Sequence, residues 1–384
     1  MTLRFPPEES GTSFRRRGGV DLIAHYGDPA GEYRAATEGV AVRDRTHRAQ
    51  WRFTGRQPVE MLKGVLTGRM PAPPEARDDG VWAGSAAYHA ALSVKARILG
   101  VLHLWREPDA DGDPGGPDGS EAPDAAEGGL CAHLPAGAAG ALREHLARLL
   151  PPRLVHLEDV SRTRGMITVV GPDAARVVSG TVLGLRVQAE ELDALAEGEY
   201  RLLSDPGGDR LLVVRNRDLA APAFDILTHR EVAGSLWDVL TGTGAEPMGL
   251  EVWSTLRVEA GRPAFGAELG PEVLPMEAGI EKRAIDHTKG CYTGQEVVVR
   301  VRDRGHVNRL LRRLVLDVNA PLPGEAEELY REGRGVGALT TVVDSPRRGK
   351  LALGYLRREV EPGHTVCVGG PDGPRARVEA LPAG

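Results

Sequence analysis

The chain has 384 residues, a formal net charge of -6 and a hydrophobic fraction of 41%. This length exceeds one ordinary core, so we expect two or three domains. The acidic balance argues against a general nucleic-acid binder, and no direct nucleic-acid binding is expected. We see no signal-peptide pattern and no apolar run of membrane-spanning length, so we expect a cytoplasmic protein that does not contact membranes.

An internal repeat organises the first two thirds of the chain. Residues 51–68 (WRFTGRQPVEMLKGVLTG) align without a gap on residues 167–184 (ITVVGPDAARVVSGTVLG). Each copy has an alternating strand, a glycine turn and an apolar-periodic helix, followed by further strands and an amphipathic helix. Three glycine pairs coincide, namely Gly55 with Gly171, Gly64 with Gly180, and Gly68 with Gly184. The pattern predicts an α+β fold with two related ferredoxin-like α/β halves.

Two further segments differ from these halves in composition. Residues 107–129 are acidic, rich in Gly, Pro and Ala, and nearly free of large apolar side chains, which predicts a disordered loop. From Leu310 onward short strands alternate with turns, which predicts a small closed β-barrel. We therefore expect domains at 1–155, including the acidic loop, at 156–308 and at 309–384.

The densest run of unusual residues extends from Leu256 to Gly305, and Cys291 stands near its centre. A neighbouring ammonium lowers the pKa of a thiol by favouring the thiolate. Cys291 is thus a candidate nucleophile or transient ligand, with Lys289 as the group that sets its pKa. The alternative is a small hydrophobe buried at a domain junction. The three cysteines lie too far apart in sequence for a disulfide framework or a local metal motif, so no metal site is expected.

Residues 289–296 read KGCYTGQE and resemble the K-G-C-Y-x-G-Q-E signature of the YgfZ family and its mitochondrial iron–sulfur assembly relatives. Residues 256–263 (LRVEAGRP), 274–281 (LPMEAGIE) and 335–355 are similar as well, so the resemblance spans from about residue 30 to the end. It implies the fold of the glycine-cleavage aminomethyltransferase, in which two α/β parts and a β-barrel surround a folate site. It also implies cofactor contacts from Tyr292, Gln295 and Glu296.

Tetrahydrofolate or a derivative is the cofactor that this resemblance implies. Its pterin edge needs a carboxylate, its aromatic middle needs apolar walls, and its glutamate tail needs cations. By resemblance to the aminomethyltransferases, Asp225 falls on their pterin-reading glutamate and Arg257 on their folate-contacting arginine. Without the resemblance, Asp225 would be a surface residue at a strand edge and Arg257 half of a salt bridge, with Glu259 as its candidate partner.

The chain departs from the aminomethyltransferases at their catalytic aspartate, which follows a turn of the K-G-G/R type and two or three apolar residues. Residues 95–102 read KARILGVL here, so the acid is missing near Val101. Loss of the acid that acts on the folate amine removes a factor of roughly 10²–10⁴ in rate. Aminomethyl transfer is therefore not expected.

The resemblance implies a folate-binding accessory factor for iron–sulfur cluster assembly or repair, which would support tRNA modification through cluster enzymes. Its partners would be a folate and iron–sulfur proteins or their assembly machinery. One alternative is a folate-dependent aminomethyltransferase or demethylase, and a second is a non-catalytic scaffold with a vestigial folate site. We also expect Cys291 to be partly solvent-accessible near the mouth of the central cavity.

Overall fold

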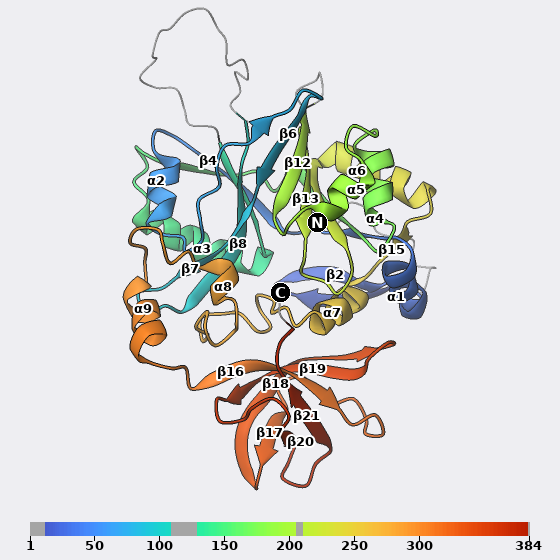
Figure 1. Ribbon diagram of the computed structural model, residues 1–384, viewed down its shortest axis with the longest axis vertical. Coiled ribbons are helices and arrows are strands. Elements are labelled where there is room, and N and C mark those ends of the chain that lie inside the picture. Colours follow the sequence, from blue (N-terminus) through green and yellow to red (C-terminus); the bar gives the residue numbers. More distant parts are fainter. Residues whose placement is uncertain (1–11, 109–128, 205–209, 383–384) are drawn as a thin grey trace, which may run out of the picture.

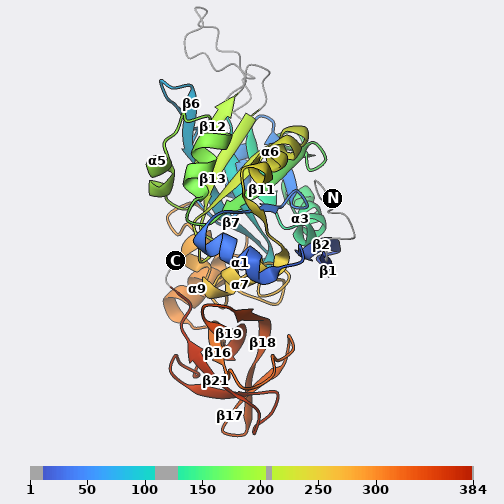
Figure 2. The ribbon, with the colours of Figure 1, turned by 90° about the vertical axis from the view of Figure 1, so that its right-hand side faces the viewer.

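The computed structural model describes residues 12–108, 129–204 and 210–382 (Figure 1). The segment predicted to be a disordered acidic loop falls, apart from its ends, outside the described residues. Two sheets lie face to face, helices cover their outer faces, and a barrel is attached at one end (Figure 2). Among the described residues, no helix combines the length and apolar character that a membrane crossing requires.

The first sheet has five strands, and helices α2 (Pro58–Lys63) and α3 (Ala136–Leu149) pack on its outer face. Its spatial order is β10 (His156–Asp159), β4 (Ala49–Thr54), β9 (Leu130–Leu134), β8 (Ile98–Arg106) and β7 (Ala87–Leu92). Leu62 and Leu142 from these helices join the buried Phe53 and Leu104 of the strands in one apolar cluster. Helices α2 and α3 therefore bury the outer face of this sheet in a hydrophobic core.

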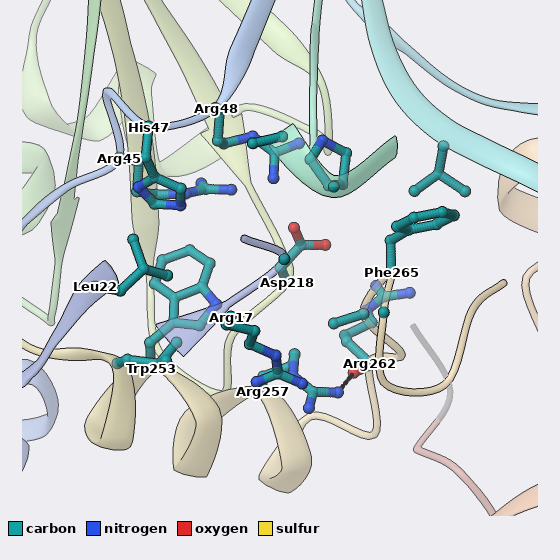
Figure 3. Close-up of a pocket in the computed structure, with 18 of the residues that line it drawn as sticks. Arg17, Leu22, Arg45, His47, Arg48, Asp218, Trp253, Arg257, Arg262 and Phe265 are labelled. Atoms are coloured by element: carbon teal, nitrogen blue, oxygen red, sulfur yellow. Dashed lines mark hydrogen bonds between the residues drawn. The ribbon is translucent and has the colours of Figure 1, made fainter. Parts of the chain in front are cut away.

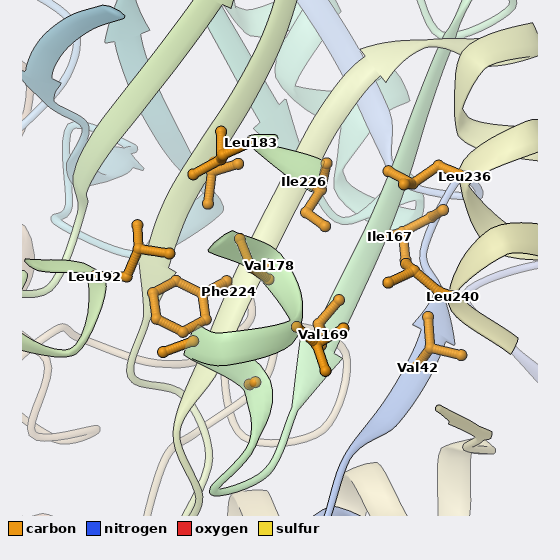
Figure 4. Close-up of a cluster of buried hydrophobic side chains, with 14 of the residues drawn as sticks. Val42, Ile167, Val169, Val178, Leu183, Leu192, Phe224, Ile226, Leu236 and Leu240 are labelled. Atoms are coloured by element: carbon orange, nitrogen blue, oxygen red, sulfur yellow. The ribbon is translucent and has the colours of Figure 1, made fainter. Parts of the chain in front are cut away.

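The second sheet has eight strands. Their spatial order is β15 (Glu246–Pro247), β3 (Ala41–Asp44), β11 (Arg164–Val170), β14 (Ala223–His229), β13 (Arg210–Asn216), β12 (Glu199–Ser204), β6 (Val81–Ser85) and β5 (Glu75–Ala76). Its outer face is covered by α4 (Ala174–Val177), the π-helical turn η2 (Val178–Val182), α5 (Ala189–Ala194) and α6 (Arg230–Gly242). Ile167 and Ile226 face these helices (Figure 4), whereas their neighbours Met166 and Leu227 face the first sheet, as the period of two in a strand requires.

The two sheets confirm the internal repeat and exchange one strand each. The order β4–β9–β8–β7 in the first sheet recurs as β11–β14–β13–β12 in the second. Strand β3 precedes β4 in the chain but pairs with β11, and β10 precedes β11 but pairs with β4. The predicted α+β fold is confirmed, and each sheet contains strands from both halves. The domain boundaries at 155 and 308 stay predictions.

Two glycines of the repeat stand at this exchange. Gly55 has φ +123° and Gly171 has φ +126°, a backbone conformation that favours glycine. A Cβ atom would lie 2.4 Å from the carbonyl oxygen of Leu154 at Gly55, and 2.3 Å from that of Gly39 at Gly171. Leu154 and Gly39 each stand two residues before an exchanged strand. The repeated glycines therefore make room for the chain that enters the opposite sheet.

An N-terminal hairpin and a group of helices close one end of the paired sheets. The hairpin consists of β1 (Ser13–Arg17) and β2 (Val20–His25), joined by Gly18 and Gly19, both with positive φ. The helices are α1 (Pro29–Glu38), α7 (Leu250–Glu259), α8 (Glu281–Ala284) and α9 (Gln295–Arg304). The hairpin packs on α7, and its turn reaches the start of α3, where a Cβ on Gly137 would lie 3.4 Å from the Cα atom of Gly18.

The C-terminal strands form the predicted closed barrel, seen at the lower end of Figure 1. Around the barrel the strands are β16 (Arg309–Leu316), β19 (Gly349–Arg357), β18 (Arg334–Ser345), β17 (Glu328–Arg331), β20 (Thr365–Val368) and β21 (Arg375–Glu379). Leu314, Leu329, Leu356 and Val378 fill its interior and are fully buried. Strand β18 packs against α7, so the barrel supports the helix that forms one wall of the site described next.

Candidate functional site

A cavity of about 320 Å³ lies between the β1–β2 hairpin, the end of β3, the start of β7, the middle of β8, helix α7 and residues 262–266. Its size is within the range of small-molecule sites. We call it the arginine cavity because seven arginines line it: Arg17, Arg43, Arg45, Arg48, Arg257, Arg262 and Arg283. Asp218 is the one carboxylate among the described lining residues. The arginine cavity therefore has a large excess of positive charge.

Four of the seven arginines have carboxylate partners and three do not. Arg45, Arg257, Arg262 and Arg283 pair with Asp225, Glu268, Glu197 and Asp218, respectively. Within the described part of the chain, Arg17, Arg43 and Arg48 have no carboxylate within salt-bridge distance. Burial lowers the pKa of Arg43 to about 10 and that of Arg48 to about 9, so both remain cationic at neutral pH. Unpaired cations in one enclosed space favour an anionic ligand.

Aromatic rings form much of the remaining wall (Figure 3). The guanidinium carbon of Arg45 lies 4.3 Å from the ring centroid of Trp253, and that of Arg283 lies 4.2 Å from Tyr88. Phe265 lines the same cavity. Flat apolar faces beside cationic groups suit a ligand that has both an aromatic system and negative charge.

Asp218 stands in the loop after β13, where Asn216 and Arg283 hold it. Its backbone N–H donates to Oδ1 of Asn216 at 2.7 Å, and its Oδ1 accepts from Arg283 at 2.7 Å. Burial alone would raise the pKa of Asp218, but the charges of Arg283 and Arg45 outweigh it and hold the pKa well below its usual range. Asp218 is therefore an ionised hydrogen-bond acceptor at neutral pH.

Asp225, the predicted pterin-reading carboxylate, does not line the arginine cavity. It is 3% exposed in the middle of β14, so it is not a surface residue either. Its Oδ1 accepts from Arg45 at 2.8 Å and from Thr168 at 2.6 Å, and its Oδ2 accepts from Asn216 at 2.9 Å. Both oxygens of Asp225 therefore have partners inside the protein, and its predicted contact with the pterin stays a prediction.

Arg257, the predicted folate-contacting arginine, lines the cavity and also takes part in a buried network. It donates to Glu268 at 2.8 Å and to Thr341 of β18 at 3.0 Å. The salt bridge considered from the sequence exists, but its partner is Glu268, since Glu259 instead accepts from Tyr33. Arg257 thus ties α7 to the barrel while it forms part of the cavity wall.

Lys289 fastens the KGCYTGQE segment to the first half of the protein. Its Nζ donates to the backbone carbonyls of Lys63 (2.9 Å), Leu66 and Gly68 (3.4 Å), at the end of α2 and the turn that follows. Cations are favoured at such a helix end, where carbonyl groups lack partners. Burial lowers the pKa of Lys289 to about 8. The hydrogen bonds of this ammonium are with the backbone, and it lies 5.3 Å from the ring centroid of Tyr292, which makes Lys289 a docking residue.

The rest of this segment is exposed or half-buried, except for Tyr292, which is buried. Cys291 is exposed, as expected, whereas Cys131 is buried and Cys367 is partly buried. Tyr292, Gln295 and Glu296 line a shallow hollow with Val94, and none of residues 289–296 lines the arginine cavity. The structure therefore does not bring Cys291 and these three predicted cofactor contacts together with Arg257. Across the described ranges, no group of three or more His, Cys, Asp or Glu could hold a metal ion.

Strand β8 supplies Val101 and His103 to the cavity wall, near the place where the sequence lacks the expected aspartate. Burial lowers the pKa of His103 well below its ordinary value, so its imidazole is neutral. The ring stacks on His133 at a centroid distance of 4.7 Å. No carboxylate is presented to the cavity from this strand.

Sequence reasoning missed Asp218, His103 and the arginines that follow β3. One signal was available for the arginines: residues 43–48 read RDRTHR, an unusual density of cations at the end of a short strand. Asp218 and His103 carry no such local signal, because their shared cavity is formed by separate sheets, a helix and a loop.

The comparisons with known proteins agree with this architecture. Residues 130–289 match the family described as "GCVT N-terminal domain". The chain is 26% identical over 376 residues to the aminomethyltransferase of Corynebacterium jeikeium, covering 93% of this chain and 88% of that one. It is 31% identical over 219 residues to that of Rubrobacter xylanophilus, a match that spans 56% of this chain and only about half (55%) of that relative.

A solved structure extends the similarity to nearly the whole chain. The glycine cleavage system aminomethyltransferase T of Bartonella henselae superimposes with a TM-score of 0.78 at 20% identity, covering 98% of this chain and 95% of that one. The match includes the paired sheets and the terminal barrel. The chain is accordingly a protein of the aminomethyltransferase fold.

Proposed function

We propose that the protein binds a reduced folate in the arginine cavity and acts as an accessory factor for iron–sulfur proteins, without transferring an aminomethyl group. The main support for this proposal is the set of residues that line the arginine cavity. Three arginines that lack carboxylate partners in the described ranges and three aromatic side chains surround one ionised carboxylate, and strand β8 contributes Val101 and His103 but no acid. This lining favours binding an anionic aromatic ligand over proton transfer to it.

Tetrahydrofolate fits these residues part by part. Its aromatic rings match the walls made by Tyr88, Trp253 and Phe265, and its carboxylates match the unpaired arginines. When bound, the folate supplies amine nitrogens that can carry one-carbon groups. Aminomethyl transfer would also require an acid at that amine. Asp218 is held ionised and His103 is held neutral, so neither donates a proton readily.

The iron–sulfur part of the proposal rests on the resemblance of residues 289–296 to the YgfZ signature. Two observations are consistent with it. The thiol of Cys291 is exposed, and the loop that carries it is held by three backbone contacts of Lys289. In this proposal Cys291 acts on a partner as a thiolate nucleophile or transient ligand, and the cluster is the partner's cargo.

The test combines binding and turnover with the purified protein. We expect calorimetry to detect tetrahydrofolate binding, and we expect no release of ammonia or methylene-tetrahydrofolate from an aminomethyl-lipoyl carrier. Turnover of about 1 s⁻¹ or faster, an ordinary enzyme rate, would favour the aminomethyltransferase alternative. Absence of folate binding would favour the vestigial scaffold.

A cellular experiment tests the accessory role. Cells that lack this protein should lose activity of iron–sulfur enzymes, including those that modify tRNA. The wild-type chain should restore that activity, whereas Cys291→Ala should not. Equal rescue by both chains would contradict a chemical role for Cys291.

A further inference from the structure

We infer that Asp218 is the carboxylate that recognises the pterin edge of the bound folate, in place of Asp225. This inference rests on the proposed folate site and goes beyond it by naming the residue that selects the ligand's head group. It follows from where the two acids stand: Asp218 lines the arginine cavity, and Asp225 does not.

Asp218 has an oxygen available for a ligand. Its Oδ1 accepts from Arg283, but among the described residues Oδ2 has no hydrogen-bond partner. The side chain of Asp218 is 21% exposed, whereas the side chain of Asp225, taken without its backbone, is 5% exposed. In Figure 3 the carboxylate projects between Trp253 on one side and Phe265 on the other. An ionised acceptor beside flat apolar surfaces is the arrangement that a planar donor edge requires.

The pterin of a reduced folate presents such an edge, since its ring N–H and exocyclic amino group are adjacent donors. A carboxylate can accept from both in the way it accepts from a guanidinium. The remainder of the cavity is cationic and offers mostly donors. Asp218 is thus the group that distinguishes a pterin-bearing anion from other aromatic anions, which the arginines would attract equally.

The position of Asp218 is prepared before any ligand arrives. Asn216 fixes its backbone, and Arg283 fixes one of its oxygens. Arg283 is held in turn by Glu197 and lies over the ring of Tyr88. A preorganised acceptor loses little conformational entropy on binding, so its hydrogen bonds contribute more fully to affinity.

The experiment compares wild type with Asp218→Asn, which keeps the size of the side chain and removes the ionised acceptor. Three probes are titrated by calorimetry: tetrahydrofolate, its 2-desamino analogue, and p-aminobenzoyl-glutamate, which lacks the pterin. We expect Asp218→Asn to bind tetrahydrofolate about tenfold or more weakly, the range of a lost charge-assisted hydrogen bond. Its affinity for p-aminobenzoyl-glutamate should equal that of wild type.

The 2-desamino analogue separates a direct contact from an indirect one. Wild type should bind it more weakly than tetrahydrofolate, and Asp218→Asn should not discriminate between the two. This wild-type comparison remains decisive if the variant does not fold, which circular dichroism would reveal. Equal wild-type affinity for both folates, or an equal loss of all three probes in the folded variant, overturns the inference. If wild type binds no folate at all, the proposed function fails instead.

Discussion

Asp225 holds Asp218 in place through one intervening side chain, that of Asn216. Oδ2 of Asp225 accepts from Nδ2 of Asn216 at 2.9 Å, and Oδ1 of the same amide accepts from the backbone N–H of Asp218 at 2.7 Å. Asp225 also holds Arg45, which lines the cavity. Asp225 therefore does not line the cavity itself but positions two residues that do, Asp218 and Arg45.

Asp225→Ala should destabilise the fold strongly, because it leaves Arg45 buried without its partner. We expect the free energy of unfolding to fall by about 3–5 kcal/mol, measured by urea denaturation. Asp21→Ala is the matched control, since Asp21 is 64% exposed and its partner Arg16, 4.0 Å away, is 73% exposed; its effect should stay within about 0.5 kcal/mol. Similar stability changes in both variants would contradict the positioning role.

Arg257→Ala should weaken tetrahydrofolate binding by about 1.5–3 kcal/mol, the usual cost of a lost charge-assisted hydrogen bond. It should also lower stability, because Glu268 would remain buried without its cation. Glu268→Gln disturbs the same network from outside the cavity lining, so it serves as the control. If calorimetry shows equal loss of affinity in the two variants, Arg257 acts through the fold and not on the ligand.

Arg48→Gln should weaken folate binding by about 1–2 kcal/mol while changing stability little. Arg48 has no carboxylate partner among the described residues, and its side chain donates to Nδ1 of His133, so its charge is available to a ligand. Arg16→Gln is the control, because this side chain is 73% exposed on the hairpin and does not line the cavity. Unchanged affinity in Arg48→Gln, measured by calorimetry, would remove Arg48 from the site.

Lys289→Met and Cys291→Ala should have different effects on stability. Lys289→Met removes three contacts to backbone carbonyls, so we expect a loss of about 1–3 kcal/mol. Cys291→Ala alters an exposed side chain and should remain within about 0.5 kcal/mol of wild type. Thermal and urea unfolding measure both. A large loss in Cys291→Ala would indicate that the thiol has a structural role.

Stability should decrease as the pH falls from 6.5 to 5, in part because of His89. Burial lowers the pKa of His89 to about 3, and its Nδ1 accepts from the N–H of Gly68. Between about pH 6.5 and pH 3 the unfolded state binds the proton and the folded state does not, so the free energy of unfolding falls with pH. At pH 5 this one group accounts for about 2 kcal/mol.

His89→Asn tests this pH dependence, because the amide oxygen can replace the acceptor without titrating. Urea denaturation at pH 7 and pH 5 should show a smaller difference in the variant than in wild type. An equal difference in the two proteins would assign the acid sensitivity to other buried histidines, such as His103 and His133, whose pKa values burial also lowers.

The sequence by itself was sufficient for the repeat, the terminal barrel and the fold class. These features depend on patterns within short segments, such as the period of two in strands and the glycine turns at Gly55 and Gly171. The reciprocal exchange of β3 and β10 between the two sheets is not indicated by any such local sequence pattern. It depends on which strand edge each segment meets, and neither segment encodes that locally.

Only the tertiary structure decided which charged residues face the cavity. Asp218 and Asp225 are seven positions apart, and a likeness to known folate sites favoured Asp225. The pairing of β14 between β11 and β13 directs Asp225 into Thr168 and Asn216, whereas the loop after β13 carries Asp218 to the opening. Side-chain direction in a sheet is set by long-range register, so the sequence alone pointed to Asp225 and missed Asp218.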